Sequence, residues 1–274
     1  MDALKQSGLA VVTAPTMDRE PTISDFKSIC QLALMEKVDG VLGIGGGSAI
    51  DVAKLVAALV GQGQAITDVF GINLLTRRKL PLVCLPTTAG TGAEVSPNAI
   101  LLDEADELKK GVVSPYLVPD AAFVDPLLTL SVPPQVTAAT GLDALTHCVE
   151  AYANKFAHPI VDVYALQGVK LIATNLLRAV RDGSDVEARG ALALGSLYGG
   201  LCLGPVNTAA VHALSYPLGG RFHVSHGVSN AVLLLHVLRF NYSAAAGRNW
   251  ELSSAIGMER NCSALADSEK AVEF

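Results

Sequence analysis

The chain has 274 residues, of which 50% are hydrophobic and 17% are charged, and its 20 basic and 26 acidic residues give a net charge of −6. This length suits one large or two ordinary domains, and the composition is that of a compact globular protein rather than a disordered one. The negative charge offers no basic surface for nucleic acid, so we expect no nucleic-acid partner.

The first 130 residues or so alternate between strand and helix patterns. A short apolar run over 38–44 ends in glycines and predicts a buried strand, and an apolar helix pattern follows over 48–61. Further strands are expected over 80–85, 97–103 and 121–125. Strands that alternate with helices predict an α/β fold with a largely parallel sheet.

From about Pro133 the pattern becomes helical. Five apolar segments with helical periodicity follow one another, over 138–153, 161–180, 186–203, 208–218 and 227–242. The stretch Leu127–Pro134, which ends in adjacent prolines, is the expected junction. The sequence therefore predicts two domains, an α/β domain over 1–130 and an all-helical domain over 131–274.

Cysteine usage and the N-terminus indicate where the protein resides. The five cysteines, at positions 30, 84, 148, 202 and 262, are scattered and contain no CxxC pair, which argues against a disulfide framework or a structural zinc knuckle. The N-terminal residues lack the apolar segment of a signal peptide, and no run reaches the roughly 18 apolar residues of a membrane span. We expect a cytoplasmic protein with no membrane partner.

Two loops at strand ends are candidates for cofactor binding. Gly45–Ser48, with the sequence GGGS, lies between a predicted strand and a helix, where free backbone amides and the helix dipole suit a dinucleotide pyrophosphate. A flexible turn is the alternative for such a run, but the position between strand and helix favours phosphate binding. Thr87–Gly92 follows the next strand, where open α/β sheets bind ligands. Ordinary turn capping explains its threonines equally well.

One aspartate and three histidines form a pattern that suits a metal ion. Asp143 and His147 are four residues apart and so project from the same face of a helix. His212 and His226 lie fourteen apart in a later segment. Each signal has a simpler explanation: a surface ion pair, a core histidine or a helix cap. Together they supply one carboxylate and three imidazoles, which suit Fe(II) or Zn(II).

Four motifs in this order and spacing resemble one enzyme family. They are GGGSAID from Gly45, PTTAGTGAEV from Pro86, GLDALTH from Gly141 and HGVSNA from His226. The chain resembles the iron-containing (group III) alcohol dehydrogenases, from about Asp25 to Asn241. The resemblance implies a Rossmann-like N-terminal domain, a helical C-terminal domain, and a cleft between them that holds NAD or NADP and the metal.

Residue by residue, the resemblance implies which side chains bind the metal and which bind the cofactor. The implied metal ligands are Asp143, His147, His212 and His226; the implied cofactor-binding residues are Gly46, Gly47, Ser48, Asp51, Thr87, Thr88, Thr91 and Lys109. The implied reaction is hydride transfer between the cofactor and a small alcohol, aldehyde or ketone, with the metal as a Lewis acid on the substrate oxygen. Four protein ligands with open positions suit Fe(II) better than tetrahedral Zn(II).

Three departures from the family pattern shape these expectations. Tyr216, the implied catalytic residue, stands where some members carry a histidine that relays a proton. A tyrosine there can still hydrogen-bond, but its higher pKa makes it a poorer base at neutral pH. The family's opening strands, with the acidic residue that selects NAD over NADP, have no counterpart before Met1, and the chain stops short of the family's closing helices at Phe274. Both domains are therefore expected to be truncated. An uncovered sheet edge would favour a homodimer or higher oligomer.

Two alternative functions stay open at this point. One is a related dehydrogenase of the same superfamily, such as a maleylacetate reductase. The other is an inactive fragment that keeps the metal site but cannot hold the adenosine half of the cofactor.

Overall fold

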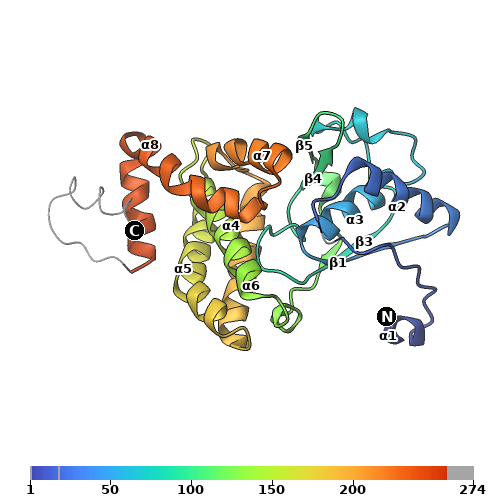
Figure 1. The fold of residues 1–274 in the computed structure, drawn as a ribbon, viewed down its shortest axis with the longest axis horizontal. Helices are drawn as coiled ribbons and strands as arrows, with labels where there is room; N and C mark the ends of the chain where they lie inside the picture. The colour runs from blue at the N-terminus through green and yellow to red at the C-terminus, as the bar shows by residue number, and fades with distance from the viewer. Residues whose placement is uncertain (1, 18, 258–274) are drawn as a thin grey trace.

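The chain folds into an α/β part followed by a helical part, which lie side by side in the computed structural model (Figure 1). The structure describes residues 2–17 and 19–257. The α/β part contains α1 (Asp2–Gln6), α2 (Ile23–Met35), β1 (Val41–Gly45), α3 (Gly47–Leu59), β2 (Gly71–Ile72), β3 (Leu82–Pro86), β4 (Asn98–Asp103), β5 (Leu108–Val113) and β6 (Ala121–Ala122). Three short 3-10 helices accompany them: η1 (Ile66–Asp68), η2 (Pro115–Leu117) and η3 (Pro126–Thr129). The helical part contains α4 (Pro134–Tyr152), α5 (Pro159–Arg181), α6 (Val186–Leu203), α7 (Ala210–Phe222) and α8 (His226–Ala255).

The parallel sheet brings the two predicted cofactor loops together. Its strand order is β1-β3-β6, with both pairings parallel, and Gly45 at the end of β1 lies opposite Pro86 at the end of β3. α3 covers one face of this sheet through a core of Ile50, Ala53, Ala57, Leu82, Cys84 and Ala93. The predicted strands and the helix between them are present, and the α/β class with a following helical region is confirmed. The GGGS loop and the threonine loop therefore start from the same edge of the sheet.

The strand predicted over 97–103 forms as β4, but it does not join the parallel sheet. β4 pairs antiparallel with β5, in a second sheet of order β2-β5-β4. The connecting turn contains Glu107 in a left-handed conformation (φ 52°), and Lys110 bridges Asp103 and Asp106 across it. β5 was not predicted because two lysines interrupt its apolar pattern.

Two charged residues of α3 connect the helix to the second sheet. Lys54 is fully buried and donates hydrogen bonds to the backbone oxygens of Ser96 and Asn98, each at 2.8 Å. The Asp51 carboxylate accepts a 3.0 Å hydrogen bond from the Ile100 amide. Burial lowers the pKa of Lys54 and raises the pKa of Asp51 to about 6. These bonds fix the start of β4 against the helix that begins at the GGGS loop.

The helical part is built around α4. α5 packs against both α4 and α6, and α8 packs across α4, around a core that includes Cys148, Val169, Ile172 and Leu192. The predicted helices are present, although α8 extends well past the predicted end at 242, as far as Ala255. By length and composition alone α5 could cross a membrane, but it is a packed helix of this bundle.

The backbones of the two parts come into direct contact at a pair of glycines. Gly92, in the loop after β3, has φ +59°, and a Cβ built on it would lie 2.5 Å from the Cα of Gly200 in α6. A Cβ built on Gly200 would likewise overlap the backbone of Gly92. Side chains are therefore excluded at this contact, which sets how close the threonine loop lies to the helical part.

We expect Gly200→Ala to destabilise the protein by about 1–3 kcal/mol, because the backbone it meets cannot move aside without a shift of the loop. Thermal unfolding measures the effect. Gly190→Ala, in the same helix, is the matched control, since the nearest atom to its Cβ would be 3.9 Å away. That control should keep or raise the melting temperature. Equal melting temperatures for the two variants would contradict the close contact.

Candidate active site

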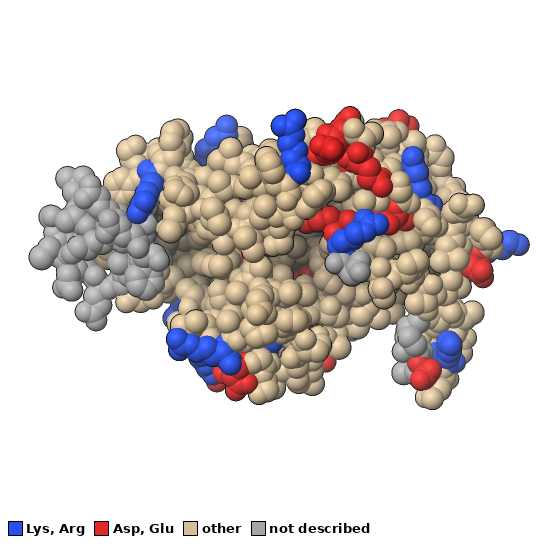
Figure 2. All heavy atoms as spheres, in the orientation of Figure 1, with Lys and Arg blue, Asp and Glu red and all other residues tan. Residues whose placement is uncertain are grey.

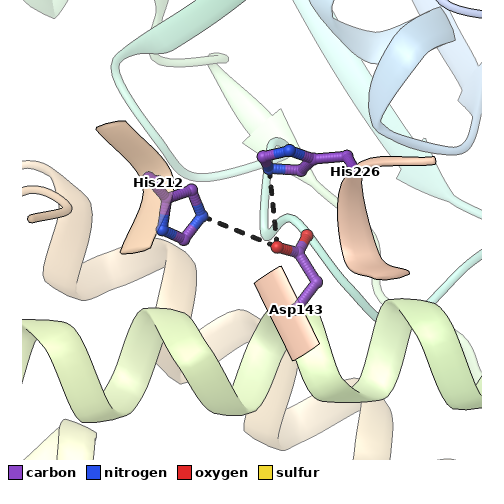
Figure 3. Close-up of side chains that lie close together, drawn as sticks. All are labelled: Asp143, His212 and His226. Carbon is purple, nitrogen blue, oxygen red and sulfur yellow. Dashed lines mark ion pairs between the residues drawn. The ribbon is translucent and has the colours of Figure 1, made fainter. Parts of the chain in front are cut away.

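Three helices bring the predicted metal ligands to one point. Asp143 comes from α4, His212 from α7, and His226 is the first residue of α8 (Figure 3). The Nε2 atoms of His212 and His226 lie 3.6 Å and 3.5 Å from Oδ1 of Asp143. The candidate ligand atoms of these three residues all lie within 4.8 Å of one another. Residues far apart in the sequence thus form one compact cluster of a carboxylate and imidazoles.

His147 lies beside this cluster rather than within it. Its ring is stacked on the ring of His212, with centroids 4.6 Å apart. The side chain is buried, and among the described residues its Nδ1 has no hydrogen-bond partner. A buried polar atom without a partner is unfavourable, and a bound ion nearby is one means of satisfying such a group.

Burial and the surrounding charges keep Asp143, His147 and His226 in the forms that bind cations. Burial opposes ionisation of Asp143, but the nearby His226 and His147 hold the pKa of that carboxyl well below its usual range. Burial lowers the pKa of His147 to about 4 and also lowers the pKa of His226. Asp143 is therefore ionised at neutral pH, and these two imidazoles are neutral with lone pairs available. Burial lowers the pKa of His212, but its hydrogen bonds to Asp143 and Glu150 outweigh this and raise that pKa to about 9, so a metal would have to displace a proton from this ring.

Asn230 and Glu150 belong to the site, although we did not assign them a role from the sequence. The Asn230 amide nitrogen donates to Oδ1 of Asp143 at 2.7 Å and lies 3.1 Å from Nε2 of His212. Glu150 contacts the other ring nitrogen of His212, Nδ1, at 2.5 Å. For both residues, the spacing along the helix from a candidate ligand could have indicated a place in the site. Asn230 is one helical turn after His226, and Glu150 is seven residues after Asp143, on the same face of α4.

The cluster lines a large cleft between the two parts of the chain. The cleft has a volume of about 1010 Å³, and the space-filling view shows the molecule hollowed between its two parts (Figure 2). Its lining includes Gly46, Gly47, Ser48, Asp51, Thr88, Thr91, Lys109, Asp143, His147, His212, Tyr216 and His226. Thr87 is not part of that lining, and its amide donates to the Gly45 carbonyl at 2.9 Å.

The glycine loop presents bare backbone to this cleft. α3 begins at Gly47, and its N-cap, Gly46, supplies no side chain to the first amides of the helix. A Cβ on Gly47 would lie 2.7 Å from Oγ1 of Thr91, so the threonine loop lies directly against this turn. Free amides at the start of a 13-residue helix suit an anionic group.

Lys109 and Tyr216 also line the cleft. The ammonium of Lys109 pairs with Glu20 at 2.7 Å, and its side chain is 3% exposed. The ring of Tyr216 lies 6.1 Å from the ring of His226, and burial raises the pKa of Tyr216 to about 12. Tyr216 is therefore a hydrogen-bond donor at neutral pH rather than a base.

Two family patterns match almost the whole chain. The pattern described as iron-containing alcohol dehydrogenase matches residues 1–126, and the pattern for the C-terminal part of the Fe-containing alcohol dehydrogenase family matches residues 137–273. The chain belongs to the iron-containing alcohol dehydrogenase family. This confirms the resemblance drawn from the four motifs, and with it the class of enzyme: a metal-containing, NAD-dependent alcohol dehydrogenase.

Individual members of the family are similar over nearly the full chain. Long-chain-alcohol dehydrogenase 1 of Geobacillus thermodenitrificans is 42% identical over 97% of this chain and 67% of the relative. A solved 1,3-propanediol oxidoreductase is 35% identical, with a TM-score of 0.95 over 99% of this chain and 72% of its own. Sulfoacetaldehyde reductase from Bifidobacterium kashiwanohense, solved with NAD+, is 30% identical, with a TM-score of 0.85 over 99% of this chain and 73% of its own.

Proposed function

We propose that this cleft transfers a hydride between a nicotinamide dinucleotide and a small alcohol, aldehyde or ketone. The observation that carries the proposal is that one cleft contains both the glycine loop at the start of α3 and the cluster of Asp143, His212 and His226. In this proposal residues 1–130 bind the cofactor and residues 131–274 hold the metal; residues 258–274 of that second range lie outside the described part of the chain.

The residues divide into two groups with separate tasks. Asp143, His147, His212 and His226 would hold a divalent metal, with Fe(II) favoured over Zn(II) because a four-ligand protein site with open positions suits a larger coordination number. When bound there, the metal supplies Lewis-acid chemistry to a substrate oxygen. The cofactor's pyrophosphate would bind the amides of Gly46, Gly47 and Ser48 at the start of α3.

The walls of the cleft orient the two reactants. Thr88 and Thr91 face the glycine loop, and Lys109 would meet the cofactor near its nicotinamide ribose, with Glu20 fixing its ammonium. Asp51, in the helix that follows this loop, fixes β4 through the hydrogen bond that its carboxylate accepts from the Ile100 amide. Thr87 would support the loop through its bond to Gly45. For hydride transfer, the protein has to hold the cofactor and the substrate close together and keep water out of the site.

We expect Tyr216→Phe to lower turnover by no more than about ten-fold, because a hydroxyl whose pKa is about 12 donates a hydrogen bond but does not take up a proton near neutral pH. Tyr216→His should add a new ionisation to the pH–rate profile near pH 6.5, with alcohol oxidation increasing as the pH rises through it. Steady-state rates from pH 5 to 10 measure both. A loss of three orders of magnitude in Tyr216→Phe would instead make the hydroxyl essential.

We further propose a homodimer or higher oligomer in the cytoplasm. Leu42 and Ile44 of β1 are 40% and 47% exposed, on the sheet face that α3 does not cover, and burial of such a face favours association. The four cysteines among the described residues are free, which fits a reducing compartment.

One assay series tests the proposed function. Purified protein of this length, loaded anaerobically with Fe(II) or Zn(II), is assayed with primary alcohols, aldehydes and maleylacetate, each with NAD(H) and with NADP(H). We expect aldehyde reduction that depends on the metal, and elemental analysis gives the metal retained. Preferential turnover of maleylacetate would favour the related reductases. Folded protein that binds metal but turns over none of these substrates would favour an inactive fragment.

A further inference from the structure

Glu150 is a buried carboxylate with three hydrogen bonds at the junction of α4 and α7. It is 5% exposed. Its Oε1 accepts a hydrogen bond from the Val211 amide at 2.6 Å, and its Oε2 accepts one from the Ala209 amide at 3.1 Å. Oε2 also contacts Nδ1 of His212 at 2.5 Å. Both oxygens are therefore used, and each faces a donor from the start of α7.

The carboxylate takes the place of a helix cap. α7 begins at Ala210, and its N-cap residue, Ala209, has no side chain that could bond the first amides. Glu150 reaches across from α4 and accepts from two amides at this end, where a negative charge is favoured. The position of α7, and of His212 in its first turn, is thus set by a residue of the helix that carries Asp143 and His147.

The same carboxylate decides which nitrogen of His212 is free. An ionised carboxylate only accepts hydrogen bonds, so Nδ1 of His212 must carry the hydrogen in this contact. Nε2 lies on the other side of the ring, 3.6 Å from Oδ1 of Asp143, inside the ligand cluster. Hydrogen bonding at one ring nitrogen of a histidine that binds metal fixes the ring and strengthens the other nitrogen as a ligand.

We propose that Glu150 is a positioning residue that holds His212 with Nε2 directed at the metal. The proposal rests on the ligand set given under the proposed function. It makes α4 the organising element of the site, because Asp143, His147 and Glu150 lie on one face of that helix at positions i, i+4 and i+7. One helix then supplies two ligands and the group that orients a third.

Glu150→Gln is the variant that tests this role. A glutamine has a single acceptor oxygen, so it cannot accept from both Val211 and His212. Either its amide group opposes the Val211 N–H, or it donates to Nδ1 and forces the hydrogen of His212 onto Nε2, where it blocks the metal. The measurement is Zn(II) affinity by competition with a chromophoric chelator. We expect affinity to fall by about 10–100-fold relative to the unaltered protein.

Two further variants separate positioning from a merely structural role. Asp185→Ala removes a different capping carboxylate, which accepts from the Ala188 amide at 2.9 Å at the start of α6. It should lower the melting temperature of the metal-free protein but leave Zn(II) affinity unchanged. Glu150→Asp keeps the charge and should recover part of the affinity. Two results would overturn the proposal. One is a Glu150→Gln variant whose Zn(II) affinity falls only in proportion to a fall in the melting temperature of the metal-free protein. The other is a Glu150→Gln variant that binds Zn(II) within two-fold of the unaltered protein.

Failure of this inference is distinguishable from failure of the proposed function. An unaltered protein that binds no Zn(II), or a His212→Ala variant that binds it normally, would overturn the ligand set itself. If both behave as expected, Glu150→Gln should have no further effect on the residual affinity of His212→Ala, because it acts through that ring. A full additional loss in that background would overturn the positioning role alone.

Discussion

Replacement of His226 by alanine should abolish metal retention and lower turnover by about a thousand-fold or more, while the helices remain folded. The imidazole Nε2 lies 3.5 Å from Oδ1 of Asp143, so its removal takes one ligand from a compact cluster. Loss of several kcal/mol of Lewis-acid stabilisation corresponds to a rate effect of this size. The His226 side chain is 23% exposed, which makes it the ligand whose removal disturbs packing least.

The matched control for this variant is His236→Ala, on the same helix but exposed and outside the cleft. It should retain metal and turnover. Metal content by elemental analysis, turnover, and far-UV circular dichroism are compared for the two variants. The same loss of metal is expected of His212→Ala, with a lower melting temperature as well, because Asp143 and Glu150 lose a buried partner. Normal metal content in either variant would remove that histidine from the ligand set.

The region around the glycine loop could be predicted because the structure that its sequence pattern favours locally is also the structure that it adopts in the folded chain. An apolar strand, a run of glycines and an amphipathic helix each have a strong sequence signature, and parallel pairing of β1 with β3 then places the threonine loop next to the glycines. The β4–β5 hairpin could not be predicted in the same way. β5 includes Lys109, which pairs with Glu20, and Lys110, which pairs with Asp103 and Asp106. Ion pairs of this kind produce no periodic pattern of apolar residues in the sequence.

The sequence predicted that Asp143, His212 and His226 would lie together, but it did not predict the residues that contact them. Asp143, His147, His212 and His226 stood out because together they supply one carboxylate and three imidazoles. Glu150 and Asn230 form hydrogen bonds with these candidate ligands, and those contacts depend on how α4, α7 and α8 cross one another. Helical spacing places each on the right face, but only the packing of the helices shows which partner it meets.

Gly47→Ala is expected to lower kcat/KM for the nicotinamide cofactor by about 10²-fold, because it misplaces the loop that would hold the pyrophosphate. A Cβ at Gly47 would lie 2.7 Å from both Cγ2 and Oγ1 of Thr91. Thr91 has little freedom to turn away, since it is β-branched and its hydroxyl accepts from the Ala93 amide at 3.2 Å. The two cofactor loops must therefore separate. Steady-state kinetics with varied NAD(H), and direct titration of the cofactor by fluorescence, measure the effect.

Gly40→Ala, just before β1, is the control, because the nearest atom to its Cβ would be 3.7 Å away and no clash results. It should bind the cofactor normally. Gly47→Ala should still retain its metal, whereas His226→Ala should still bind the cofactor. Opposite losses of this kind are expected if the glycine loop and the histidine cluster are separate halves of one cleft. If Gly47→Ala bound the cofactor as tightly as Gly40→Ala, the pyrophosphate would have to bind elsewhere in the cleft.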